Sequence, residues 1–322
     1  MGDVVYRRFQ AGDEVAVNEG FNEVFGVDRP LGEWLWKFPA GPEGRWIFLA
    51  VGGDNRILAH YGVVPVRLQA GELVVLAGQI VDVYSRGEAR EGLASARIFL
   101  KTVSTFIERH CNPENLSLCY GFPGTRALRL GVMRSGYDQV PPQPVTVWRR
   151  PATGRRNLFN RHRVRIGFDR AAIDTLWSRA RARYPLAAVR DGSWLNRRFT
   201  GRPGVEYVHL GAWRGGNPHA WAVLRPAAPV AQWLDLIWDG EDPRALAALD
   251  RQATKLAVRS GATEIEMWLD ADREAALELA RIGWEATPHP DIRLVVHSFH
   301  PEIMPAAVPG RFYVTKGDAD LV

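Results

Sequence analysis

The chain has 322 residues, of which 46% are hydrophobic and 24% are charged, and its formal net charge is +5. This is the ordinary composition of a soluble globular protein, and the length suggests two domains. No apolar run approaches the roughly 18 to 20 residues that a membrane-spanning helix needs, and the first residues lack the apolar core of a signal peptide. We therefore expect a cytoplasmic protein with no membrane partner.

The cysteine content argues against a structural metal site, and the net charge favours an anionic ligand. Cys111 and Cys119 are the only cysteines; in a reducing compartment we expect two buried free thiols, although a disulfide between them remains an alternative. Two cysteines are too few for a structural zinc site, so no metal is expected. The modest positive charge is almost all arginine. It suits an anionic ligand such as a nucleotide cofactor and does not by itself indicate nucleic acid.

The first half of the chain reads as a strand, a helix, a meander of strands, and then helix, strand, helix and strand. The apolar run 46–51 ends at Gly52-Gly53-Asp54-Asn55, which predicts a hairpin turn. Residues 92–109 keep apolar side chains at helical spacing, which predicts one long amphipathic helix. The other strands are expected at 4–9, 57–68, 73–84, 116–120 and after Gly136, and the other helices at 13–25 and 125–133.

The second half repeats this order. The strand patterns at 79–84 and 232–237 are alike, and each is followed by a turn and a long helix, the second at about 243–259. A strand at 265–269, a helix at 275–282 and a Gly-aromatic pair then follow in the same sequence. This suggests duplication, although two unrelated α/β domains can share such an order.

Arginines crowd residues 149–170, between the two halves. This stretch has glycine and proline punctuation and no single helical face, so we interpret it as a solvated basic linker and do not expect it to bind nucleic acid. The expected division is an N-terminal domain at 1–148, the linker at 149–170 and a C-terminal domain at 171–322.

Several segments, in this order, resemble the GNAT superfamily of N-acyltransferases, and in particular a bacterial group with two GNAT domains in tandem. The segments that carry the resemblance are 33–38, 60–65, 77–82, 120–123 and 313–322. The resemblance covers nearly the whole chain. It implies an α+β fold with a mixed, mostly antiparallel sheet, built from two tandem GNAT-like acyl-CoA N-acyltransferase domains. It also implies acetyl-CoA or another acyl-CoA as co-substrate.

In GNAT enzymes the loop that opens the long helix has the form Arg/Gln-x-x-Gly-x-Gly/Ala, and its backbone N–H groups bind the cofactor diphosphate. Gly92-Leu93-Ala94 fits the second part of this motif, but Ala89 stands where Arg or Gln is expected. The loop is otherwise an ordinary glycine-containing helix start. The resemblance also pairs the backbone of the preceding strand with the pantetheine arm. It assigns these residues to the cofactor: Val81, Val83, Arg86, Gly87, Arg90, Glu91, Gly92, Leu93, Ala94 and Ser95.

The corresponding turn of the second half, 238–243, carries three carboxylates and a proline that has no backbone N–H. Three negative charges would repel a diphosphate, so the C-terminal domain is predicted not to bind CoA.

GNAT acyl transfer proceeds by direct attack of an amine on the thioester, which needs a base for the ammonium and an acid for the leaving thiolate. The tyrosine that many members use as the acid is replaced by Val132. Candidates for these roles are Tyr120 as acid, and Asp82, His60 or the C-terminal carboxylate of Val322 as base. Each of the three side chains has a structural alternative: a half-buried strand tyrosine, a satisfied carboxylate and a buried, hydrogen-bonded histidine. Asp82 is expected to face away from its two neighbouring core valines.

Three functions follow from these residues. The first is acetyl-CoA-dependent N-acylation of an amine on a small molecule or amino-sugar. The second is a FemAB-like transferase that uses aminoacyl-tRNA, because 193–199 is faintly similar to a segment of that group and the basic linker would suit tRNA. The third is a non-catalytic GNAT-like binding module, as Ala89 and Val132 would suggest. The acceptor and the oligomeric state are not readable from the sequence.

Overall fold

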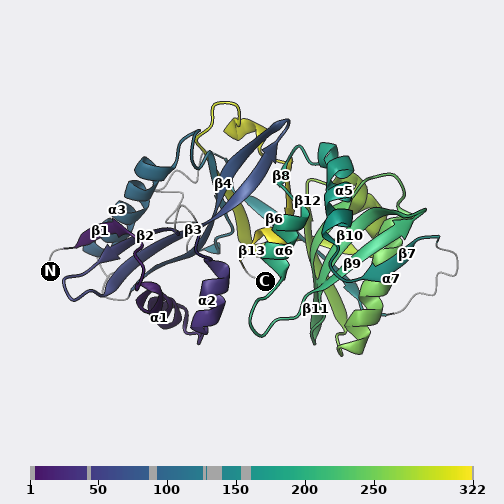
Figure 1. Ribbon diagram of the computed structural model, residues 1–322, viewed down its shortest axis with the longest axis horizontal. Coiled ribbons are helices and arrows are strands. Elements are labelled where there is room, and N and C mark those ends of the chain that lie inside the picture. Colours follow the sequence, from purple (N-terminus) through teal and green to yellow (C-terminus); the bar gives the residue numbers. More distant parts are fainter. Residues whose placement is uncertain are drawn as a thin grey trace. The chain divides into compact units, whose positions relative to one another are not determined.

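The computed structural model describes residues 4–41, 45–86, 93–125, 128, 140–153 and 161–320, with the backbone alone at 93–95 (Figure 1). It divides into two compact units. Unit 1 comprises Met1–Arg67, Val75–Pro142 and Arg293–Ala307, and unit 2 comprises Leu68–Val74, Gln143–Ile292 and Val308–Val322. Within the described part of the chain, no helix is long and apolar enough to cross a membrane.

The sheet of unit 1 has the strand order β1-β2-β3-β4-β5-β13. β1 with β2, β2 with β3 and β5 with β13 are antiparallel, whereas β4 and β5 are parallel, so the sheet is mixed. The elements are β1 Val5–Arg8, α1 Glu14–Phe25, α2 Leu31–Lys37, β2 Trp46–Val51, β3 Ile57–Ala70, β4 Leu73–Ser85, α3 Leu93–His110, β5 Leu118–Gly121, the end of β13 Glu285–Ser298, and the 3₁₀ turn η3 Pro305–Ala307.

Helices cover both faces of this sheet, which is why β2 is buried along its whole length. Because side chains alternate between the faces of a strand, Ile47 and Leu49 pack with α1 and α2, whereas Trp46 and Phe48 pack with α3. Helix α2 was not predicted from its Pro-Gly-rich surroundings. It forms where Trp34 is completely buried against the sheet.

The sheet of unit 2 has the order β6-β12-β11-β10-β9-β7, with β14 beside β12 and β8 beside β14. β11 and β12 are parallel, and β6 and β12 are antiparallel. Its elements are β6 Gln143–Pro151, β7 Arg163–Ile166, α5 Arg170–Ala180, η2 Arg181–Arg183, β8 Leu186–Ala188, α6 Gly192–Phe199, β9 Val208–Arg214, β10 Asn217–Arg225, β11 Val230–Trp238, α7 Arg244–Arg259, β12 Glu264–Asp270, α8 Arg273–Arg281, the start of β13, β14 Phe312–Thr315 and η4 Lys316–Asp318.

We expected the first domain to end at residue 148, but the two units exchange strands, so no single cut in the sequence separates them. Strand β6 follows the first half of the sequence but pairs with β12 of unit 2, while the end of β13 returns to pair with β5 of unit 1. The stretch 149–170 also differs from a solvated linker, because it contains the end of β6 and all of β7, which pairs with β9. A strand's own residues specify its extended form and burial, and they do not specify which sheet it joins.

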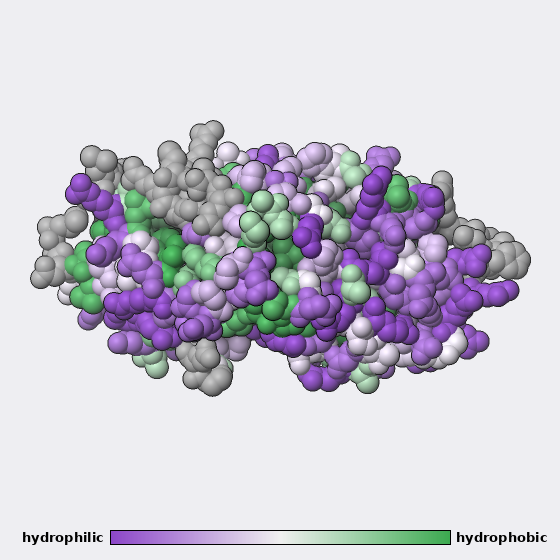
Figure 2. Space-filling view, turned by 90° about the horizontal axis from the view of Figure 1, so that it is seen from above, coloured by the Kyte–Doolittle hydropathy of each residue, from purple (hydrophilic) through white to green (hydrophobic). Residues whose placement is uncertain are grey.

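The predicted hairpin at Gly52 to Asn55, the long helix and the strand–helix–strand order of the second half are confirmed by β2–β3, α3, and β11–α7–β12. Most of the helix expected at 125–133 lies outside the described residues. The face seen in Figure 2 is largely polar, with apolar side chains gathered in smaller patches, as expected when most large apolar residues are in the two cores.

Candidate active site

In unit 1 the parallel strands β4 and β5 pair only briefly. Their register runs from Ala77 opposite Leu118 to Gln79 opposite Tyr120. β5 then ends at Gly121, whereas β4 continues to Ser85. Within the described residues, the β5-facing edge of β4 therefore has no paired strand beyond Gln79. Free backbone N–H and C=O groups at such an edge can bind an extended ligand as a neighbouring strand would.

The backbone of β4 is irregular at Asp82, which has a positive φ of 51°. The backbone carbonyl of Leu76 accepts a hydrogen bond from Ser117 N, before β5, whereas Arg86 N donates to Leu58 O on β3. In a regular strand, residues of the same parity point their polar groups at the same neighbour. The opposite directions at positions 76 and 86 therefore require one extra residue between them.

The bulge also reverses the side-chain alternation. Val81 and Tyr84 both pack in the cluster beneath α1 and α2, whereas Val83 packs in the cluster beneath α3. The Asp82 carboxylate reaches Arg29 and Lys37, which lie on the α1–α2 side. The prediction that Asp82 faces away from both valines is therefore wrong, because it assumed a regular strand.

Asp82 is held by two cations. Its carboxylate, with 1% of the side chain exposed, lies 2.6 Å from Arg29 Nη1 and also accepts a hydrogen bond from Lys37 Nζ. Burial opposes ionisation, but Lys37 and Arg29 outweigh it and hold the pKa of Asp82 below its usual value. This carboxylate clamps the bulge of β4 to the α1–α2 segment, which favours the structural alternative over a general base.

His60 lies beside the same bulge and is completely buried. Its Nδ1 is 2.6 Å from the backbone oxygen of Asp82, and its ring stacks on Tyr84 at 5.1 Å between centroids. Burial lowers the pKa of His60 to about 4, so the ring is neutral at pH 7. Since a carbonyl can only accept, the proton is on Nδ1, which leaves the buried Nε2 with no hydrogen-bond partner among the described residues.

Tyr120 occupies the last paired position before β4 and β5 separate. It is 1% exposed, and its ring meets the edge of Phe122 at 6.1 Å between centroids. Of the predicted acids and bases described in the structure, it is the one that stands at the point of separation.

The predicted cofactor loop is only partly described. Arg86 is buried, and its Nε lies 3.4 Å from Glu23 Oε2. Gly87, Arg90, Glu91 and Gly92 lie outside the described residues, as does Val322. Leu93, Ala94 and Ser95 form the first turn of α3, and the structure gives their backbone only.

In unit 2 the equivalent parallel pair also separates, but another segment fills the gap. β11 pairs with β12 from Val230 opposite Glu264 to Trp233 opposite Met267. Beyond that point β12 pairs with β14, at Leu269 with Thr315 and Asp270 with Val314. β14 also contacts β11, because the hydroxyl of Tyr313 donates to the backbone oxygen of Leu236 at 2.7 Å. The C-terminal segment 312–318 thus lies between the separated strands.

A buried charge network fixes this segment. Arg190, with none of its side chain exposed, binds Asp235 on β11 at 2.9 Å and Asp318 in η4. The hydroxyl of Thr315 donates to Asp235 Oδ1 at 3.0 Å. Burial raises the pKa of Asp235 despite the nearby guanidinium.

The turn that follows β11 differs from a diphosphate-binding loop. Asp242 Oδ1 accepts from the backbone N–H of Arg244 at 2.9 Å, so a carboxylate of the turn already binds an N–H at the start of α7. The guanidinium of Arg183 packs against Gly240, where a Cβ atom would lie 2.2 Å from Nη1. It also lies 4.8 Å from the ring of Trp238.

No model of a known protein family matches the sequence, and no curated protein matches it either. Solved structures do match. A GCN5-related N-acetyltransferase from Anabaena variabilis has a TM-score of 0.67 at 11% identity, and a probable N-acyltransferase from Enterococcus faecalis has 0.64 at 10%; each match covers 92% of this chain and 73% of the other. Saccharomyces cerevisiae N-myristoyltransferase with bound myristoyl-CoA has a TM-score of 0.59 at 12% identity, covering 92% and 83%.

The fold is that of the GNAT acyltransferases. The resemblance inferred from the sequence is confirmed at the level of the fold. Sequence reasoning missed Arg29, Lys37 and Arg190 as partners of buried carboxylates. Their identity is not signalled by spacing, since each lies far along the chain from the acid that it binds.

Replacing Asp82 by Asn tests the clamp on the bulge. At neutral pH the change removes the carboxylate that faces two buried cations, and we expect the free energy of unfolding to fall by about 3–5 kcal/mol. Because the pKa of Asp82 is lowered in the folded protein, its contribution is fully present above the unfolded pKa of about 3.9 and is lost as the pH falls through the folded value. Denaturant unfolding at several pH values should show the difference between the two proteins shrinking only below about pH 4. A difference that stays constant with pH contradicts the clamp.

Replacing Arg190 by Met tests the network of unit 2. Two buried carboxylates would lose their cation, and we expect a loss of about 3–5 kcal/mol in the free energy of unfolding. Arg149→Met is the matched control, because Arg149 is 47% exposed and pairs with Glu266 near the surface; it should cost at most about 1 kcal/mol. Similar losses in the two variants, measured by urea unfolding, would show that Arg190 does not hold the C-terminal segment.

Proposed function

We propose that unit 1 is an acyl-CoA-dependent N-acyltransferase that transfers an acyl group directly to an amine of a small molecule or amino-sugar. The observation that carries the proposal is the separation of the parallel strands β4 and β5, with a bulge in β4 and a long helix starting after it. This is the arrangement expected of a GNAT cofactor groove. The match to a myristoyl-CoA-bound transferase supports an acyl-CoA as the co-substrate.

The bulge determines which backbone N–H and C=O groups of β4 face the open edge, where they could form hydrogen bonds with the pantetheine arm. The carbonyl of Val81 lies on the β3 side, 3.0 Å from the position of a Cβ on Gly62. Past the bulge the direction reverses, so the backbone of Val83 is turned toward the open edge. Of the two predicted valines, Val83 is therefore proposed to pair with the cofactor. The diphosphate would bind the first turn of α3, where free N–H groups and the helix dipole favour an anion.

In the proposed reaction the amine nitrogen attacks the thioester carbonyl, the C–N bond forms, the C–S bond breaks, and the thiolate takes a proton. Tyr120 is proposed as the donor of that proton, because it stands where the strands separate and a thioester between them would lie. Asp82 is bound by two cations, and burial lowers the pKa of His60 to about 4, which makes it a weak base, so both are proposed to shape the groove. Val322 remains the proposed base.

Unit 2 is proposed to be a second GNAT-like domain that does not bind acyl-CoA. Its β11–α7–β12 order repeats β4–α3–β5, including the parallel strand pair. Its groove is filled by β14 and η4, and its turn presents carboxylates. This inserted segment is a stronger reason than the repulsion predicted from the sequence, because it takes up the backbone edge with which a pantetheine arm would pair.

The two alternative functions gain no support from the described residues. The arginines at the start of the basic stretch are engaged within unit 2: Arg149 binds Glu266, and Arg150 binds Asp250 at 2.5 Å. They do not form the free basic tail that a tRNA-dependent transferase would use.

Calorimetric titration of acetyl-CoA and a long-chain acyl-CoA tests the proposal. We expect one molecule to bind per chain. Ala94→Asp, which places a negative charge in the first turn of α3, should weaken binding at least about tenfold. Arg244→Asp also places a negative charge in the first turn of a long helix, here α7, with a charge change of two units in place of one, and should leave binding unchanged. Absence of acyl-CoA binding with retention of tRNA would select the FemAB-like transferase, absence of both would select the non-catalytic module, and weakening by Arg244→Asp alone would place the site in unit 2.

A further inference from the structure

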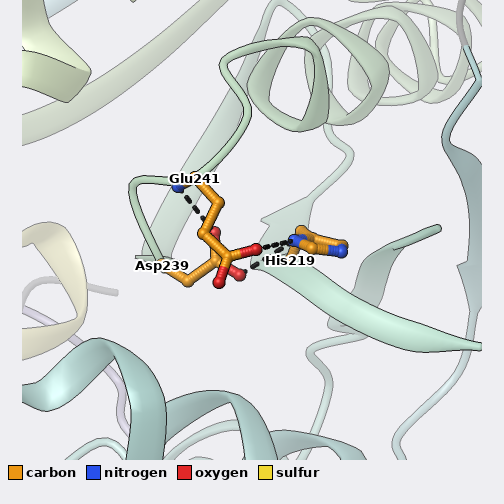
Figure 3. A group of neighbouring side chains, drawn as sticks. All are labelled: His219, Asp239 and Glu241. Carbon is orange, nitrogen blue, oxygen red and sulfur yellow. Dashed lines mark hydrogen bonds and ion pairs between the residues drawn. The ribbon is translucent and has the colours of Figure 1, made fainter. Parts of the chain in front are cut away.

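Three potential metal ligands converge at one end of the β10–β11 hairpin in unit 2. They are His219 on β10, and Asp239 and Glu241 in the turn after β11 (Figure 3). Ala220 pairs with Trp238, and Asp239 N donates to the backbone oxygen of His219 at 3.1 Å. The hairpin register thus places the imidazole and the two carboxylates together, and their ligand atoms all lie within 4.8 Å of one another.

The distances among these atoms suit a shared cation. His219 Nδ1 lies 2.9 Å from Asp239 Oδ2 and 3.4 Å from Glu241 Oε2. Zinc binds imidazole nitrogen and carboxylate oxygen at about 2.0–2.2 Å in a tetrahedral arrangement, which puts neighbouring ligand atoms about 3.3–3.6 Å apart, so a bound ion requires the closer pair to open by about half an ångström. His219 Nδ1 is itself buried, and it makes no hydrogen bond of acceptable geometry to either carboxylate. The imidazole and the two carboxylates therefore lie close together, and no hydrogen bond from His219 Nδ1 accounts for this.

The surroundings orient the ligands. Asp239, with 2% of its side chain exposed, uses Oδ1 to accept the backbone N–H of Glu241 at 3.1 Å, which leaves Oδ2 turned toward His219. One positive charge already lies near Asp239, since Arg179 Nη2 is 3.1 Å from its Oδ2. A bound cation would compete with this guanidinium.

We propose that His219, Asp239 and Glu241 form a binding site for a divalent transition-metal cation of the zinc class. An imidazole ligand favours zinc and its neighbours over magnesium or calcium, which prefer oxygen ligands alone. Three protein ligands leave a coordination position for water or another ligand. The site lies in the turn that corresponds to the expected diphosphate loop of unit 1, so this turn would bind a cation in place of an anion. The sequence analysis expected no metal because the chain has only two cysteines. It missed these three ligands because no short sequence motif contains them.

Titration of the full chain with Zn²⁺ by calorimetry, and with Co²⁺ followed by its visible absorption, tests the proposal. We expect one site per chain. Glu241→Gln should weaken binding at least about tenfold, and it should leave folding intact because Glu241 is 60% exposed. Glu274→Gln, at a carboxylate that is 68% exposed in the same unit, is the matched control and should leave the affinity unchanged. Arg179→Ala should tighten binding, because it removes the competing positive charge.

Two results would overturn the proposal. One is equal Zn²⁺ affinity in the unaltered chain, Glu241→Gln and His219→Ala, which would show adventitious binding or none. The other is binding that survives His219→Ala and is lost in Cys111→Ser. That result would assign the metal to the two free thiols of unit 1, whose sulfur atoms lie 3.8 Å apart.

Discussion

The structure depends on a backbone constraint that both units share. Each contains a pair of parallel strands that separate after a few residues, β4 with β5 and β11 with β12. Separated strands expose N–H and C=O groups, and such groups are rarely left without hydrogen-bond partners when buried. In unit 2 the protein supplies the partner itself, as β14 and η4. In unit 1, within the described residues, no strand takes that place, and this difference is the basis for assigning the ligand to unit 1.

Buried charges hold each arrangement in place. In unit 1, Arg29 and Lys37 bind Asp82 at the bulge. They thereby connect α1 and α2 to the part of β4 where the backbone of Val83 is proposed to face the open edge. In unit 2, Arg190 joins Asp235 of β11 to Asp318 of the inserted segment. Buried ion pairs add little net stability compared with well-packed apolar residues, but loss of one partner is costly. We propose that their contribution here is to fix one geometry of each pair of separated strands.

Much of the fold was predictable from local pattern. The long helix, the hairpin at Gly52 to Asn55 and the repeated strand–helix–strand order follow from periodicity and turn residues. The exchange of β6 and β13 between the sheets was not predictable, since strand pairing depends on tertiary contacts. The bulge at Asp82 was missed for a related reason: an aspartate with positive φ is uncommon, and nothing in the neighbouring residues marks it. A regular alternation placed Asp82 on the wrong face.

The candidate site was predictable to a smaller extent. The resemblance located the strand and the helix start, and the structure places Tyr120 where the strands separate. The chemical roles stay predictions, and residues 87–92 and Val322 lie outside the described part of the chain. The segment that lies between the separated strands of unit 2 could not be anticipated, because it is remote in sequence. The three acids of the turn predict that unit 2 does not bind CoA, and the inserted segment is a second reason to propose this.

Amide hydrogen exchange with and without acetyl-CoA tests the central claim most directly, because it reports which backbone edge the ligand pairs with. The account predicts slower exchange in peptides covering the end of β4 and the first turn of α3, with no change in peptides covering the end of β11, the start of α7 and β14. Slower exchange in β11, or faster exchange in β14 as the ligand displaces it, would place the ligand in unit 2 and contradict the account.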